Sequence, residues 1–129
     1  MLNPLFLSEK EIRKIIELMF FAYRDFTSGP DEVLKKINFG RAHHRVIYFV
    51  GRKDKITIKN LLSILQITKQ SLSRVLNQLV SEKYIIVSES HGNDKRTKSL
   101  SLTEKGKKLE TQLTKIQINK IKIILKNSE

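Results

Sequence analysis

A chain of 129 residues has the size of a single domain and can bury a core without covalent staples. It contains no cysteine, which excludes disulfides and thiolate metal sites and favours a reducing, cytoplasmic location. Its 25 Lys and Arg against 13 Asp and Glu give a formal charge of +12, which favours a polyanionic partner, while its apolar runs are too short to predict a membrane span.

The first predicted element is an amphipathic helix over residues 8–27, for which Ser8 is a suitable N-cap. Its apolar residues recur at three- and four-residue spacing, at Ile12, Ile15, Ile16, Met19, Tyr23 and Phe26. The Gly29-Pro30 pair predicts the end of this helix, and residues 31–38 are expected to form a separate short helix. A helix this apolar near a terminus is expected to pack against more than its own domain.

Three elements are predicted in the next stretch of the chain. Residues 41–51 are expected to form a buried helix that ends at Gly51. Ile56 and Thr57 could form a very short strand, after which Thr57 would cap a helix over residues 58–65.

A second short helix follows, with Thr68 as its expected cap. Its apolar stripe consists of Leu72, Val75, Leu76, Leu79 and Val80. Its opposite face carries small polar or basic side chains, namely Gln70, Ser73, Arg74 and Asn77, with Lys69 and Ser71 beside them. Two short helices joined by a tight turn predict a helix-turn-helix.

The remaining elements are two strands and a final helix. Residues 84–90 and 98–102 are expected to pair as strands, with Leu100 and Leu102 on one face and a Gly-Asn turn between the strands. Thr103 is expected to cap a helix that runs to the end of the chain. The apolar positions of that helix are Leu109, Leu113, Ile116, Ile121, Ile124 and Leu125.

The polar face of the second short helix suits the major groove of DNA. Amide, guanidinium and hydroxyl groups match the donors and acceptors of base edges, and the N-terminal residues of such a helix usually face the bases. An ordinary solvated helix face is the alternative. The whole chain is rich in Lys, Ile and Asn, and this composition alone could account for the positive charge. The placement of the basic residues must therefore distinguish a DNA-binding surface from a general bias in composition.

The tip between the two strands is basic and favours the DNA interpretation. An extended Arg96 at such a tip can enter a minor groove, with Lys95 and Lys98 on phosphates. Asp94 could pair with Arg74 or Arg96 and fix its direction, or could be a plain turn residue. The residues expected at DNA are Thr68, Lys69, Gln70, Ser71, Ser73, Arg74, Asn77, Asn93, Asp94, Lys95, Arg96 and Lys98.

No metal, cofactor or catalytic site is predicted. His43 and His44 are adjacent, so on a helix they point about 100° apart and cannot chelate one ion together. A core or interface histidine is expected instead. The chain offers no Ser-His-Asp spacing, paired carboxylates or glycine-rich phosphate loop, so it is not expected to be an enzyme.

The segments TIKNLLSILQITKQSLSRVLNQLVSEKYI and NDKRTKSLSLTEKGKKL resemble the MarR family of winged helix-turn-helix regulators. The resemblance depends mainly on an Asp-x-Arg in the wing, followed by Leu-x-Leu-Thr-x-x-Gly. The resemblance implies homodimers that bind palindromic double-stranded DNA, and many members respond to a small-molecule effector. Family members usually continue with another long C-terminal helix, so an end at Glu129 is expected to shorten the dimer surface.

Residues and resemblance together predict a mostly α fold with a small antiparallel β-wing, in a single domain over residues 1–129. Residues 41–102 would form the winged helix-turn-helix core, and residues 8–27 and 103–129 the dimerisation helices. The predicted function is a sequence-specific transcriptional regulator. The alternative is a winged-helix module that binds protein or RNA, although the expected reading surface carries no aromatic side chain for stacking on single strands.

Overall fold

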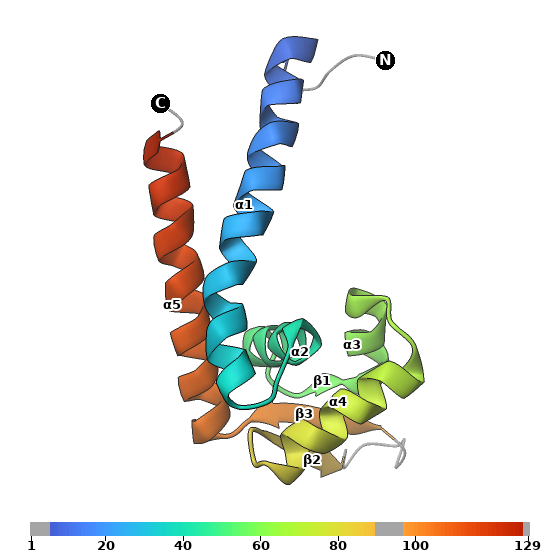
Figure 1. The fold of residues 1–129 in the computed structure, drawn as a ribbon. Coiled ribbons are helices and arrows are strands. Elements are labelled where there is room, and N and C mark those ends of the chain that lie inside the picture. Colours follow the sequence, from blue (N-terminus) through green and yellow to red (C-terminus); the bar gives the residue numbers. More distant parts are fainter. Residues whose placement is uncertain (1–5, 90–96, 128–129) are drawn as a thin grey trace.

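The computed structural model describes residues 6–89 and 97–127. Two long helices, α1 (Glu9–Lys36) and α5 (Glu104–Asn127), pack against each other and extend away from the rest of the fold (Figure 1). Their bases join a compact unit that contains the remaining helices, α2 (Arg41–Arg52), α3 (Ile58–Leu65) and α4 (Lys69–Ser81). None of the described helices is both long enough and apolar enough to cross a bilayer.

A small antiparallel sheet completes the compact unit. Its strands are β1 (Ile56–Thr57), β2 (Ile85–Glu89) and β3 (Lys98–Leu102), in the order β1-β3-β2. Leu100 of the central strand pairs with Ile56 on one side and with Val87 on the other. Helix α3 follows β1 and α4 follows α3, so the predicted winged helix-turn-helix is confirmed.

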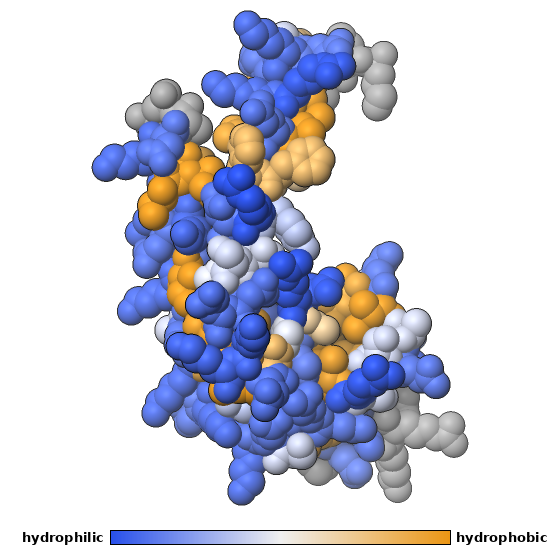
Figure 2. Space-filling view, in the orientation of Figure 1, coloured by the Kyte–Doolittle hydropathy of each residue, from blue (hydrophilic) through white to orange (hydrophobic). Residues whose placement is uncertain are grey.

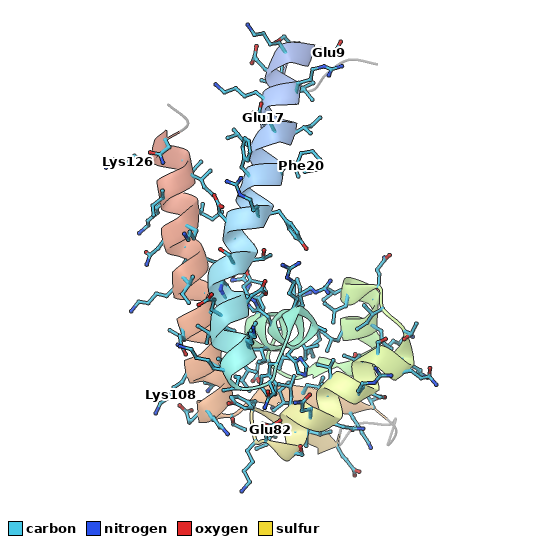
Figure 3. The ribbon with its side chains drawn as sticks, viewed as in Figure 1. Glu9, Glu17, Phe20, Glu82, Lys108 and Lys126 are labelled. Atoms are coloured by element: carbon cyan, nitrogen blue, oxygen red, sulfur yellow. The ribbon has the colours of Figure 1, made fainter. Side chains whose placement is uncertain are left out.

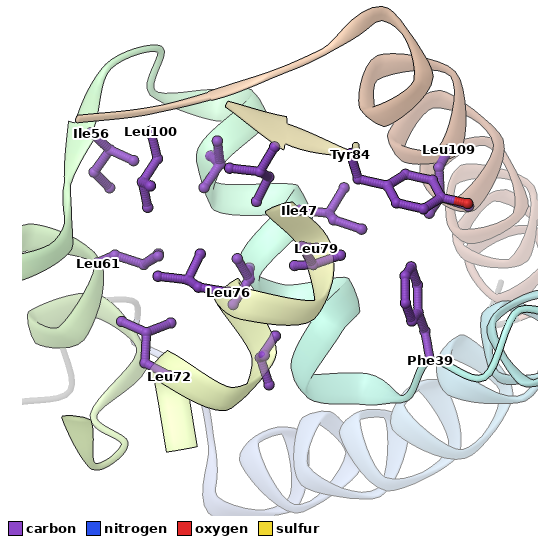
Figure 4. Packing of buried hydrophobic residues seen from close by; sticks show 14 of the residues in the cluster. Phe39, Ile47, Ile56, Leu61, Leu72, Leu76, Leu79, Tyr84, Leu100 and Leu109 are labelled. Atoms are coloured by element: carbon purple, nitrogen blue, oxygen red, sulfur yellow. The ribbon is translucent and has the colours of Figure 1, made fainter. Parts of the chain in front are cut away.

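The core lies where α2, α3, α4 and the sheet meet (Figure 4). Four elements contribute residues that are almost completely buried, namely Ile47 of α2, Leu61 of α3, Leu72 and Leu79 of α4, and Leu100 of β3. Fully burying a side chain of this size contributes about 1.5–3 kcal/mol relative to leaving it exposed. This shared core fixes the helix-turn-helix and the wing as one unit.

Helix α1 is continuous, so the prediction that Gly29-Pro30 ends it is wrong. A proline removes one hydrogen bond from a helix interior, and tertiary packing has to offset that loss. Pro30 is buried, and Gly29 lies so close to α5 that an added Cβ would be 2.6 Å from Cγ2 of Ile116. Packing against α5 and the core therefore keeps α1 helical across Gly29-Pro30, a pair that usually ends a helix where it is exposed to solvent. Residues 31–36 belong to α1 and do not form a separate helix.

The three predicted threonine caps are confirmed. The hydroxyl oxygens of Thr57, Thr68 and Thr103 accept hydrogen bonds of 3.0–3.1 Å from backbone N–H groups three residues later. Thr103 also donates to the carbonyl of Lys83 at 2.6 Å, which ties the start of α5 to the residues just before β2. Helix α3 ends at Leu65, and the left-handed backbone of the following Gln66 begins the sharp turn toward α4.

Apolar side chains remain exposed along the two long helices (Figure 2). On α1 these are Ile12, Ile15, Ile16, Met19, Phe20, Phe21 and Tyr23, and on α5 they are Ile118, Ile121, Ile123 and Leu125. Figure 3 shows Phe20 on the part of α1 that stands clear of the compact unit, where it is 73% exposed. Exposed apolar surface of this extent marks an interaction site.

Candidate nucleic-acid interface

Helix α4 has one buried face and one open face. Leu72, Val75, Leu76 and Leu79 are buried in the core, as the sequence pattern predicts. Val80 departs from that pattern, because it lies at the rim of the stripe and is 37% exposed. The buried face leaves the opposite side of α4 free to meet a partner.

The open face of α4 consists of the side chains expected to read DNA. All of them are exposed, namely Lys69, Gln70, Ser71, Ser73, Arg74 and Asn77. Ser71 accepts a hydrogen bond from Thr68 at 2.9 Å, within the cap. Among the described residues, the side chains of Gln70, Arg74 and Asn77 have no hydrogen-bond or ion-pair partner, so their donors and acceptors are available to a ligand.

Of the wing residues expected at DNA, only Lys98 lies within the described residues. Lys98 begins β3 and is exposed, but it pairs in register with Glu89 of β2, whose carboxylate reduces the local positive charge. The predicted Asn93, Asp94, Lys95 and Arg96 lie outside the described residues. Their contacts with DNA, and the pairing of Asp94 with an arginine, stay predictions.

One supporting residue of α4 was not predicted from the sequence. The Gln78 side chain hydrogen-bonds to the His43 ring over 2.7 Å and donates to the backbone carbonyl of Asn38 at 3.4 Å. These contacts join residues 35 and 40 positions apart, and neither apolar periodicity nor a short motif signals such a pair. They connect α4 to the turn between α1 and α2.

A cavity of about 370 Å³ lies beside this unit, where α1, α2 and α5 meet. It is lined by Tyr23, Phe26, Thr27, Arg41, His44, Arg45, Tyr48, Phe49 and Gln117. A second hollow of about 400 Å³ along α5 shares Phe26, Tyr48 and Gln117 with it. The sequence pattern predicts three separate helices here and gives no signal that their residues meet, so this cavity was missed.

Arg41 and His44 set the electrostatics of the cavity wall. Arg41 forms a two-pronged ion pair with Asp31, with a shortest distance of 2.9 Å, and donates to the Tyr23 hydroxyl at 3.2 Å. Burial lowers the pKa of His44 below its usual value, and the carboxylates of Asp31 and Glu110 offset part of that shift. The wall therefore presents a fixed guanidinium and a neutral imidazole beside aromatic rings.

The two adjacent histidines have different neighbours. Within residues 6–89 and 97–127, no group of three or more potential metal ligands is close enough to hold an ion. His43 is instead bonded to a backbone N–H and to Gln78, and His44 lies in the cavity wall.

Comparison with known proteins shows to which family the chain is related. The sequence model described as the MarR family matches residues 37–97. The HTH-type transcriptional regulator PetP of Rhodobacter capsulatus is 48% identical over 113 residues, which are 88% of this chain and 68% of that protein. The chain belongs to the MarR family. It is a MarR-type transcriptional regulator and not an enzyme.

Solved structures agree with the fold. A MarR transcriptional regulator from Methanosarcina mazei Go1 has a TM-score of 0.70 at 26% identity, and the match covers 88% of this chain and 81% of that one. Streptococcus pneumoniae FabT, solved in complex with DNA, has a TM-score of 0.75 at 19% identity, with 89% of this chain and 82% of that one covered. The mostly α winged-helix fold predicted from the sequence is confirmed for the described residues.

Proposed function

We propose that this MarR-family chain binds a palindromic operator in double-stranded DNA as a homodimer. The polar face of α4 would enter the major groove, with Gln70, Ser73, Arg74 and Asn77 near base edges. Lys69 and Lys98 would contact phosphates, and Arg96 would enter the minor groove. Residues 1–129 would act as one domain, with α1 and α5 as the dimerisation helices and the compact unit as the reading head.

The observation that carries this proposal is the open face of α4. Its polar side chains are exposed, and Gln70, Arg74 and Asn77 lack partners among the described residues. Amide and guanidinium groups in a row along one helix face match the hydrogen-bonding edges of base pairs. The exposed apolar stripes of α1 and α5 support the homodimer, and a two-fold dimer reads half-sites about 34 Å apart or a multiple of that distance.

Binding should be specific for duplex and steeply dependent on salt. Each neutralised phosphate releases counterions, so log affinity is expected to fall with log salt at a slope of about −0.9 per contact. The test selects duplexes from a random pool and titrates the best one at two salt concentrations, with a scrambled duplex and the matching single strand as controls. Salt-insensitive binding, or equal binding to the single strand, would contradict the proposal and favour a protein- or RNA-binding module.

Arg74→Ala should cost roughly 1–3 kcal/mol of operator binding and relax base preference at one position in each half-site. The reason is that a guanidinium without a protein partner can bond a base edge at two points. Repeating the duplex selection with the variant measures both effects. If Arg74 pairs with Asp94 instead, Arg74→Ala and Asp94→Ala should both lose modest affinity and keep the same preferred bases.

A small-molecule effector and a cytoplasmic location complete the proposal. The cavity beside α2 has a volume within the usual range for small-ligand sites, and its aromatic wall suits a small aromatic ligand. A regulator of this type works where the chromosome lies, which supports the cytoplasm.

A further inference from the structure

We propose that His43 is a positioning residue for DNA reading: through Gln78 it sets the orientation of α4 and thereby the preference for operator over unrelated duplex. This inference rests on the proposed function. His43 lies in the first turn of α2, and its contact with α4 is made through the Gln78 side chain.

The two ring nitrogens of His43 have different tasks. Nδ1 accepts the backbone N–H of Gly40 at 3.0 Å, which caps the start of α2. The proton therefore sits on Nε2, and Nε2 donates to Oε1 of Gln78 at 2.7 Å. One imidazole thus joins the beginning of α2 to the C-terminal half of α4.

Aromatic packing holds the His43 ring in place. The ring of Phe39 stacks on it with centroids 4.6 Å apart and planes 8° apart. Phe39 is itself buried and meets the edge of Tyr84 at 5.2 Å. The imidazole is fixed before Gln78 bonds to it, so little side-chain entropy opposes the contact.

On α4, the side chain of Gln78 makes both contacts with the region around the start of α2. While its carbonyl oxygen meets His43, its amide nitrogen donates to the backbone carbonyl of Asn38. Both partners belong to the α1–α2 turn and the helical turn after it. Apolar packing in the core is not directional, whereas two hydrogen bonds at one residue restrain rotation of α4 about its axis.

Orientation matters more for base reading than for phosphate binding. Hydrogen bonds to base edges need heavy-atom distances near 3 Å, while charge attraction to phosphates tolerates larger shifts. Loss of the connection should lower affinity for the selected operator and leave affinity for unrelated duplex unchanged. The same turn of α2 also carries Arg41 and His44, which line the cavity.

Two substitutions of His43 separate its tasks. The oxygen of His43→Asn can still accept the Gly40 N–H, but its side chain is too short for Gln78. The longer amide of His43→Gln keeps a donor for Gln78. We expect His43→Asn to lower the ratio of operator to scrambled-duplex affinity roughly fivefold, as for loss of one net hydrogen bond, and His43→Gln to restore most of it.

The experiment titrates the full chain with the selected and scrambled duplexes and records melting temperatures in parallel. Gln78→Met, alone and combined with His43→Asn, completes the set. It should reproduce the loss, and the double variant should lose no more than either single one, because both remove the same connection. Wild-type protein without an operator preference would refute the proposed function itself. A wild-type preference that His43→Asn and Gln78→Met both retain, or equal losses on both duplexes, would overturn the role of His43.

Discussion

Gly106→Ala is expected to lower the free energy of unfolding by about 2 kcal/mol or more, with a melting temperature roughly 8 °C lower. A Cβ on Gly106 would lie 2.2 Å from the carbonyl oxygen of Tyr84 and 3.3 Å from Cβ of Leu102. The first of these atoms is backbone, and it also accepts hydrogen bonds from the N–H and hydroxyl of Thr103. It cannot move away without breaking the junction of β2 and α5. The gain of about 1 kcal/mol in helix propensity from alanine does not offset this overlap.

Gly40→Ala is the matched control, because a Cβ on Gly40 would meet nothing within 4 Å. That variant should stay within about 0.5 kcal/mol of the wild type, since a weaker N-cap and a stiffer unfolded chain have opposite effects. Chemical unfolding of both variants at one protein concentration measures the difference. Equal stability of the two would show that α5 does not pack against Tyr84 as closely as described.

The same contact explains part of the sequence motif by which the family is recognised. In the run Leu-x-Leu-Thr-x-x-Gly, Leu100 fills the core, Thr103 caps α5 and Gly106 lets α5 approach the start of β2. The roles of Leu100 and Thr103 depend on residues close in sequence or on a period-two pattern, so the sequence predicts those elements correctly, whereas the role of Gly106 depends on the distant Tyr84. The caps at Thr57 and Thr68 were predictable for the same local reason.

Features that depend on distant partners were not predictable. The local sequence around Pro30 predicts the end of a helix. Only the burial of Pro30 and the approach of Gly29 to α5, which are tertiary features, explain why the helix continues. The bond between His43 and Gln78, and the cavity shared by three helices, arise from tertiary packing that leaves no periodic trace. The open face of α4 was predicted, because a buried apolar stripe fixes which residues point away from it.

Introducing two acidic residues on α1, with Ile16→Glu and Met19→Glu, should convert a dimer into a folded monomer and weaken operator binding roughly hundredfold or more. Ile16 is 47% exposed and Met19 66% exposed within one chain, so the fold of the single chain does not depend on burying them. In the proposed dimer both would be covered by the partner's helices, where an unpaired carboxylate is costly. A monomer would hold one half-site and lose the effective concentration that links the two reading heads.

Lys14→Glu is the matched control, because it lowers the net charge of the chain by two, as the double variant does. Helical geometry of about 100° per residue places Lys14 on the opposite side of α1 from Ile16 and Met19. Sedimentation at tens of micromolar and titration of the selected duplex should show a dimer with near wild-type affinity for Lys14→Glu, and a monomer with weak binding for the double variant. Circular dichroism should show the same helix content in both. A wild-type chain that sediments as a monomer would contradict the homodimer, and a double variant that stays dimeric would place the self-association surface elsewhere than on this face of α1.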